Sequence, residues 1–216
     1  MVRTARNLAI WILLAIPALA AAVDFDAIET LTSPAQKVDA YEALLGVDAD
    51  SAEILFKLGN AYYDMQLHDE AIERYRRSLR AAADLPVLVN LTYVLAELNR
   101  REEADKAFRD FLAARPLDPL ARAFYADFLA ESGEIAAEPE ERQKETQRAA
   151  EEYRRALEID PRCVEARFGF GVLFARAGIF EEAIREWKRA LETDPRHRLA
   201  SRLRVNISDA ERRLGR

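Results

Sequence analysis

Residues 58–75 read LGNAYYDMQLHDEAIERY, and this stretch decides the fold. Its apolar residues keep helical spacing, yet Gly59 lies inside the first helical run. Glycine costs about 1 kcal/mol relative to alanine in a helix interior. Something other than local helix propensity must therefore favour glycine at this position.

The composition of the chain predicts an all-α fold. Half of the 216 residues are hydrophobic and 32% are charged, with only 7 glycines and 8 prolines. Alanine, leucine, glutamate and arginine dominate, and these residues favour helices. No window shows the sustained alternation of β-branched residues that is typical of a strand.

A period of about 34 residues runs through the sequence, with one insertion. Four small residues stand at separations of 33, 34 and 45: Gly59, Thr92, Ala126 and Gly171. Alanines follow them in acidic surroundings at Ala71, Ala104, Ala149 and Ala183. Aromatic residues come four positions later, at Tyr75, Phe108, Tyr153 and Trp187. Fixed periods of this length indicate stacked helical units.

The chain resembles the tetratricopeptide repeat, a helix-turn-helix unit of about 34 residues. Residues 52–79 and 164–195 carry the best copies, AEILFKLGNAYYDMQLHDEAIERYRRSL and VEARFGFGVLFARAGIFEEAIREWKRALETDP. The resemblance implies a right-handed α-solenoid of about four repeats over residues 52–197. The expected repeats are 52–85, 85–118, 119–163 with the insertion, and 164–197. Residues 23–51 are expected to form a degenerate N-terminal helical unit, and 198–216 a capping helix.

This family pattern gives Gly59 a physical reason. The two helices of a repeat pack at close range, so a side chain at Gly59 is expected to push the second helix away at Ala71. Gly133 and Gly178 are expected where a first helix turns into a second. Glycine permits the left-handed conformation that ends many helices.

The third repeat contains 11 extra residues between Ala126 and Ala149. Eleven residues make about three helical turns, so they can lengthen a helix without rotating its apolar face. The sequence predicts one long second helix from about Pro139 to Leu157, with solvated early turns. This long helix is interpreted either as an arm to which a partner docks or as a surface extension that the fold tolerates.

In such repeats the first helix of each unit lines a concave groove. Helical spacing selects these groove residues: Phe56, Asn60, Tyr63, Asp64, Val89, Asn90, Tyr93, Glu97, Ala123, Asp127, Glu131, Phe168, Val172 and Arg176. The surface is apolar and aromatic with an acidic rim. It suits an extended or helical protein segment with apolar side chains and some positive charge. The alternative to partner binding, for each of these residues, is that its side chain packs against the neighbouring repeat.

One subfamily grips a C-terminal carboxylate with asparagines and basic residues, as in the chaperone-tail clamp. Asn60 and Asn90 match the two asparagines. Phe56, Leu120 and Phe124 stand where lysine or arginine is required, and Lys57, one position away from Phe56, is expected to face elsewhere. The sequence therefore argues against carboxylate clamping.

The N-terminus has the pattern of an export signal. Arg3 and Arg6 precede an apolar run over residues 8–23, which contains Pro17 and then small residues. This pattern is typical of a secretory signal peptide, here residues 1–22. One alternative is an uncleaved membrane anchor, although the run is short for a spanning helix, and another is a buried helix. The signal peptide and the anchor both predict a periplasmic body, free or anchored to the inner membrane.

The sequence offers no catalytic motif and no metal-ligand spacing, so no enzyme activity and no cofactor are expected. Residues 196–216 carry seven arginines against Asp209 and Glu211, in a chain of net charge −6. Export argues against nucleic acid as the partner. The predicted function is a non-catalytic adaptor that binds a protein or peptide and assists complex assembly. The alternative is a membrane-tethered or self-associating scaffold that acts through its termini, and the oligomeric state is left open.

Overall fold

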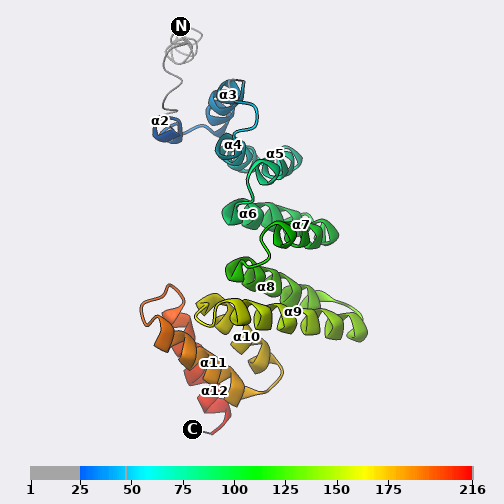
Figure 1. Ribbon diagram of the computed structural model, residues 1–216, viewed down its shortest axis with the longest axis vertical. Coiled ribbons are helices and arrows are strands. Elements are labelled where there is room, and N and C mark those ends of the chain that lie inside the picture. Colours follow the sequence, from blue (N-terminus) through cyan, green and yellow to red (C-terminus); the bar gives the residue numbers. More distant parts are fainter. Residues whose placement is uncertain (1–24, 47, 216) are drawn as a thin grey trace. The chain divides into compact units, whose positions relative to one another are not determined.

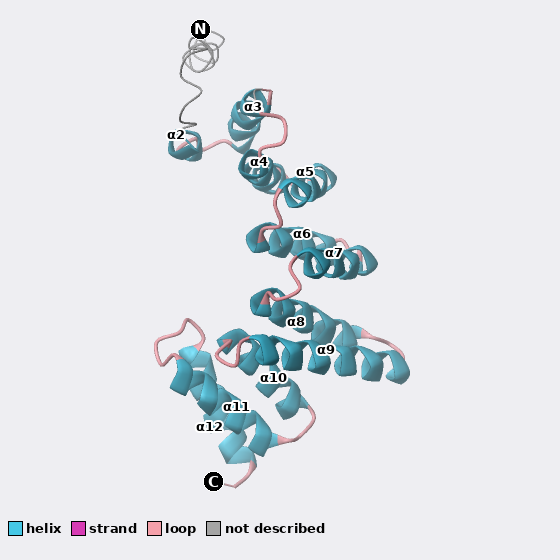
Figure 2. Ribbon diagram, in the orientation of Figure 1, coloured by secondary structure: helices cyan, strands magenta, loops and turns pink. Residues whose placement is uncertain are grey.

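The computed structural model describes residues 25–46 and 48–215. Within these ranges the chain forms eleven α-helices, α2 to α12, and no strand (Figures 1 and 2). The predicted all-α class is therefore confirmed. The described residues divide after Ala104 into two compact units, called unit 1 and unit 2, each of which has its own cluster of buried apolar residues.

The described part of unit 1 contains five helices and the first four residues of a sixth. The helices are α2 (Phe25–Glu29), α3 (Pro34–Leu45), α4 (Ala52–Asp64), α5 (His68–Ala81), α6 (Leu85–Glu97) and α7 (Arg101–Ala114), which continues into unit 2. Successive pairs from α3 to α6 pack side by side. A cluster of buried apolar residues joins α2, α3 and α4, and it includes Tyr41 and Leu58.

Unit 2 contains the rest of α7 and the five helices that follow. They are α8 (Pro119–Ile135), α9 (Pro139–Ile159), α10 (Val164–Arg176), α11 (Phe180–Thr193) and α12 (Ala200–Arg213). Helices α8 and α9 lie side by side along much of their length (Figure 1). Helix α12 packs on α11, where Leu203, Ile207 and Ala210 join the buried cluster around Trp187.

Gly59 is required by an aromatic ring rather than by Ala71. A Cβ atom at Gly59 would lie 2.6 Å from Cε1 and 2.7 Å from Cδ1 of Tyr75 on α5. The same contact recurs in the last repeat, where a Cβ atom at Gly171 would lie 2.3 Å from Nε1 of Trp187. The expectation that a side chain at Gly59 would collide with the second helix is confirmed, but it would meet the ring of Tyr75 first rather than Ala71. The small residue of α4 makes room for the aromatic side chain of α5.

The turns that follow α4, α6 and α10 each contain one residue with a left-handed backbone conformation. Gly178 has a φ of +74°, as expected for a helix end, but Gln66 and Asn99 adopt φ values of 61° and 57° at the corresponding turns. Gly133 does not end a helix. It lies buried inside α8, where an added Cβ atom would meet the Arg142 carbonyl oxygen of α9 at 3.3 Å. That glycine permits close helix packing instead of a turn.

The insertion is divided between two helices. Helix α8 has 17 residues where α4 and α10 have 13, and α9 has 21 where α5 and α11 have 14. The four and seven extra residues are close to one and two whole turns, so both apolar faces keep their orientation. The long α9 is confirmed, and the extension of α8 by one turn is a feature that the sequence pattern did not predict.

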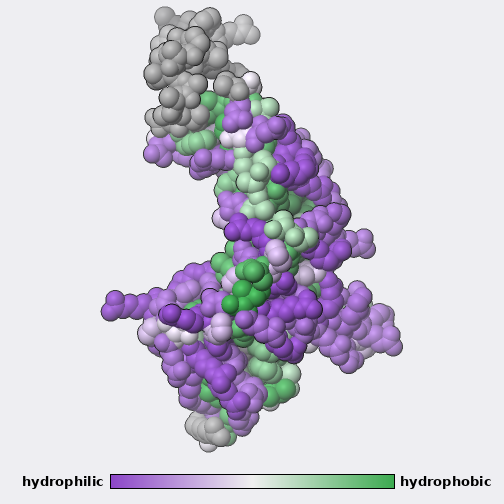
Figure 3. Space-filling model, in the orientation of Figure 1, coloured by the Kyte–Doolittle hydropathy of each residue, from purple (hydrophilic) through white to green (hydrophobic). Residues whose placement is uncertain are grey.

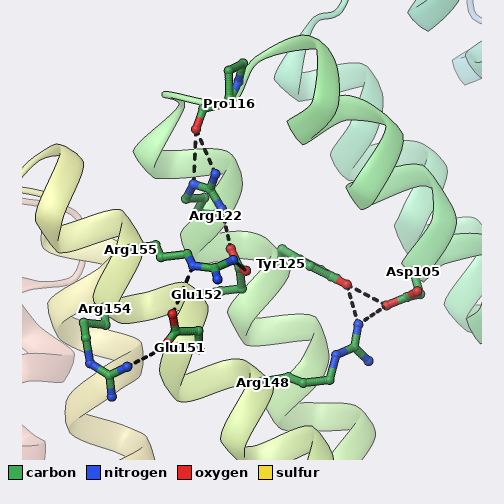
Figure 4. Close-up of polar contacts among 9 residues, drawn as sticks. All are labelled: Asp105, Pro116, Arg122, Tyr125, Arg148, Glu151, Glu152, Arg154 and Arg155. Carbon is green, nitrogen blue, oxygen red and sulfur yellow. Dashed lines mark hydrogen bonds and ion pairs between the residues drawn. The ribbon is translucent and has the colours of Figure 1, made fainter.

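Ion pairs and hydrogen bonds connect the helices of unit 2 (Figure 4). Arg148 of α9 donates to Asp105 of α7 at 2.7 Å, and Tyr125 of α8 donates to the same oxygen at 2.7 Å. Burial disfavours the charge on Asp105, but these hydrogen bonds outweigh it and hold the pKa of Asp105 below its usual value. The network fixes α7, α8 and α9 in one register.

A second arginine contact repeats along unit 2. Arg122 donates to the Pro116 carbonyl oxygen and to Glu152, the latter at 2.6 Å (Figure 4). Arg167 makes the same pair of contacts, with the Pro161 carbonyl oxygen and Glu186. Each arginine thereby ties the turn before its own helix to the following helix.

Candidate binding surfaces

Hydrophilic residues cover most of the face shown in Figure 3, with smaller hydrophobic patches among them. Each unit carries a pocket lined by residues predicted for the groove. The two pockets are described separately and are called the unit 1 pocket and the unit 2 pocket.

The unit 1 pocket has a volume of about 550 Å³. Five of the predicted groove residues line it: Asn60, Tyr63, Asp64, Asn90 and Tyr93. The pocket also contains Glu29, Lys37, Tyr41, Lys57, Ala61, Tyr75 and Val94, which helical spacing did not select.

Three predicted groove residues of unit 1 do not line this pocket. Phe56 packs on Tyr75, with ring centroids 6.1 Å apart. The backbone carbonyl of Val89 accepts a hydrogen bond from Thr92. The carboxylate of Glu97 accepts a hydrogen bond from the Tyr63 hydroxyl at 3.1 Å. Phe56 supports the wall of the pocket, and Glu97 orients one of its tyrosines.

The two asparagines of the unit 1 pocket are held by each other and by Tyr75. Oδ1 of Asn60 accepts from the Tyr75 hydroxyl at 2.8 Å and from Nδ2 of Asn90 at 2.9 Å. This arrangement leaves Nδ2 of Asn60 and Oδ1 of Asn90 without a hydrogen bond to any residue that the structure describes. One amide donor and one amide acceptor are thus free, the two groups that a peptide backbone unit needs.

An aromatic edge borders these amides. The rings of Tyr63 and Tyr93 meet edge to face, with centroids 6.2 Å apart. Tyr93 is 56% exposed, which leaves much of its ring available for contact. Exposed tyrosine offers a rigid apolar surface at a low cost in conformational entropy.

Lys57 lines the unit 1 pocket, so the expectation that it faces elsewhere is wrong. Its ammonium group is already paired with Glu29 of α2 at 3.1 Å. Lys37 donates to the same carboxylate at 2.7 Å, and the Tyr41 hydroxyl does so at 2.8 Å. The Lys37 hydrogen bond is the largest cause that lowers the pKa of Glu29 to about 2, against the opposing effect of burial. Glu29 therefore pairs with both lysines of this pocket.

The unit 2 pocket has a volume of about 390 Å³. Five of the groove residues predicted in this unit line it: Asp127, Glu131, Phe168, Val172 and Arg176. The other lining residues are Ala130, Glu134, Tyr153, Gly169, Leu173 and Arg202. Helices α8 and α10 supply most of the wall, and α12 supplies Arg202. Ala123 is fully buried and does not line the pocket.

Arg202 belongs to the segment that the sequence predicts as a basic cap. In the structure its guanidinium group lies over the Phe168 ring, 4.9 Å from the ring centroid. Arg204, by contrast, donates to the Pro195 carbonyl oxygen. Arg202 follows Phe168 by one repeat period, so the period could have placed it in the groove.

Two further observations bear on other functions. No group of three or more histidine, cysteine, aspartate or glutamate residues that could hold a metal ion occurs within residues 25–46 and 48–215. In the same ranges, no helix is both long and apolar enough to span a membrane. The signal peptide predicted for residues 1–22 lies outside the residues that the structure describes.

Comparison with known proteins identifies the repeat. A family model described as tetratricopeptide repeat (TPR) matches residues 38–86 and 140–197. Together with the helical pairs and their small-residue and aromatic contacts, this match shows that the chain belongs to the tetratricopeptide-repeat family. Members of this family are generally non-catalytic modules for protein interaction. No curated protein matches the sequence.

Solved structures with the same fold include three TPR-type proteins. MamA is 22% identical with a TM-score of 0.59, over 81% of this chain and 96% of that one. TTC0263, a thermophilic TPR protein of Thermus thermophilus, is 18% identical with a TM-score of 0.60. The match covers 77% of this chain and 84% of TTC0263. YrrB, described as a TPR protein with an unusual peptide-binding site, is 21% identical with a TM-score of 0.54. The match covers 83% of this chain and 88% of YrrB. At these identities the likeness establishes the fold alone.

Proposed function

We propose that this protein is a non-catalytic adaptor that binds an extended segment of a protein partner and helps a complex to assemble. The free amide groups of Asn60 and Asn90 carry this proposal, because they present a donor and an acceptor beside an exposed tyrosine. Backbone hydrogen bonds provide affinity in such recognition, and apolar pockets provide specificity. The peptide-binding site named for YrrB is consistent with this use of the fold.

The location of the protein is part of the same proposal. The basic start and the apolar run of the N-terminus support export, with the body in the periplasm of a bacterial envelope. The intact mass of the protein recovered from its host envelope tests this. A mass that lacks the predicted signal peptide supports cleavage, and the full mass supports the anchored alternative.

A peptide-display experiment tests the binding surface. Random decapeptides are selected on the full chain, and the dissociation constants of the selected peptides are measured by fluorescence anisotropy. Tyr93→Ala is expected to weaken binding about tenfold or more, because it removes an exposed aromatic contact. Leu98→Ala is the matched control, since Leu98 is also an exposed apolar residue of unit 1 but does not line the pocket. Equal binding by both variants would contradict a role for the unit 1 pocket.

A test of the alternative scaffold function, through the basic C-terminal helix, needs a charge reversal that leaves the unit 2 pocket unchanged. Arg202 lines the unit 2 pocket, so a change there affects both modes of contact. Arg213 lies over the Phe180 ring, and Arg212 pairs with Asp209. Charge reversal at Arg196 and Arg204, which do not line the unit 2 pocket, tests self-association by sedimentation velocity.

A further inference from the structure

Three carboxylates and two arginines line the unit 2 pocket, which leaves it a formal charge of −1. Asp127, Glu131 and Glu134 lie at positions i, i+4 and i+7, so they share one face of α8. Glu134 is paired with Arg176 at 2.7 Å. Glu131 forms no ion pair with any residue that the structure describes, and Asp127 is bonded only to the uncharged Tyr153 hydroxyl, at 2.5 Å. Two carboxylates therefore face the pocket without a cation in contact.

The surroundings of Asp127 show that this charge is costly. Its side chain is exposed toward the pocket, but surrounding protein removes much of its hydration and raises its pKa to about 6. The groups that face it are Tyr153 from α9, Glu165 and Arg176 from α10, and Arg202 from α12. Tyr153 and the two arginines lower its pKa, and Glu165 raises it. Their combined effect does not offset the lost hydration, so a further cation would stabilise this carboxylate.

The apolar residues that α10 contributes to the pocket suit an aliphatic stem. Phe168 and Val172 lie one helical turn apart on α10 and face the same pocket. The guanidinium group of Arg202 lies over one face of the Phe168 ring, so this ring already makes a contact with a cation. Lysine and arginine combine an apolar stem with a charged end, which fits a pocket with an apolar wall and a carboxylate wall. The described residues offer no three-ligand group for a metal ion.

We propose that the unit 2 pocket recognises a lysine or arginine side chain of the bound segment, whose charge contacts Asp127 and Glu131 and whose stem packs on Phe168 and Val172. This inference rests on the proposed peptide-binding function and names the residue type that this pocket takes.

Binding of the selected decapeptides tests the inference. A peptide with one basic residue is synthesised again with norleucine in place of lysine, which keeps the stem and removes the charge. The norleucine peptide is expected to bind wild-type protein about five to ten times more weakly, as is the lysine peptide to Asp127→Asn or Glu131→Gln. Asparagine still accepts the Tyr153 hydrogen bond, and Glu131 is exposed, so both variants are expected to fold. Glu192→Gln is the control, because it removes an exposed carboxylate of unit 2 outside the pocket.

The pH dependence supplies a second measurement. If only ionised Asp127 binds the lysine peptide, the competent fraction falls to about 9% at pH 5, and the affinity is about tenfold lower than at pH 7.5. This loss is expected to disappear in Asp127→Asn. Addition of the peptide is expected to lower the pKa of Asp127, as followed by the ¹³C shift of its carboxyl group.

The outcomes separate the two proposals. Peptides that bind saturably, with equal affinity for lysine and norleucine and no effect of Asp127→Asn or Glu131→Gln, overturn the basic-residue inference alone. The absence of any saturable peptide binding overturns the proposed function and this inference with it.

Discussion

Substitution of Gly59 by alanine is expected to destabilise unit 1, although alanine is the better helix former. The added Cβ atom would lie 2.6 Å from Cε1 of Tyr75, so the ring has to move by about 1 Å to reach ordinary contact. Tyr75 is only 1% exposed, and its hydroxyl is bonded to Asn60 at 2.8 Å. Overpacking costs roughly 1–3 kcal/mol, and a weakened buried hydrogen bond adds about 1 kcal/mol. The gain in helix propensity offsets about 1 kcal/mol, which leaves a net loss of about 2 kcal/mol.

Urea unfolding of the full chain measures this loss, and hydrogen exchange of the α4 and α5 amides assigns it to unit 1. The same substitution in a Tyr75→Ala background is the control, with both proteins held folded by the same concentration of sucrose. Without the ring, Gly59→Ala is expected to stabilise the chain by about 1 kcal/mol, from helix propensity alone. A substitution that is neutral in the wild type, or equally harmful with and without the ring, would refute the steric reasoning.

Three further predictions concern charge and backbone strain. The lowered pKa of Glu29 contributes stability that is present above about pH 4.5 and lost as the pH falls toward 2. Because its side chain is 39% exposed, Glu29→Gln is expected to remove only about 1 kcal/mol at pH 7 and to flatten acid unfolding in that window. Arg167→Met should cost about 2–3 kcal/mol in urea unfolding, since it leaves the nearly buried Glu186 carboxylate short of a partner, and adding Glu186→Gln should restore most of the loss. Gln66→Gly should raise the melting temperature by about 2–4 °C by relieving a positive φ, whereas Gly178→Ala should lower it by a similar amount without any clash.

Helical spacing predicted much of the candidate surface because it fixes the direction of each side chain from its own helix. Asn60, Tyr63 and Tyr93 meet in the unit 1 pocket as that argument requires. The spacing did not find Lys57, whose Cβ atom points about 100° away from that of Phe56 on the helix. Its long side chain reaches the pocket because the carboxylate of Glu29, far earlier in the chain, attracts it.

Residues from other elements were harder to predict. Glu29 belongs to a five-residue helix outside the repeats, and no period in the sequence places it beside Lys37 and Lys57. Arg202 carries a usable signal, since it follows Phe168 by one repeat period. The apolar positions of α12 nevertheless predict only that one face of this helix packs on the preceding repeat. They do not predict that the side chain of Arg202 extends into the unit 2 pocket.

The sequence by itself determined the repeating helical units of this protein, because small and aromatic residues recur at fixed separations that only paired helices can satisfy. It also determined that the insertion keeps every apolar face in place, since its length is close to a whole number of turns. Only the tertiary structure decided that α8 takes one of those turns and α9 two, and that Tyr75 rather than Ala71 excludes a side chain at Gly59. The physical reason is that spacing along a chain fixes the direction of a side chain, whereas its partner depends on distances between helices that the period does not contain.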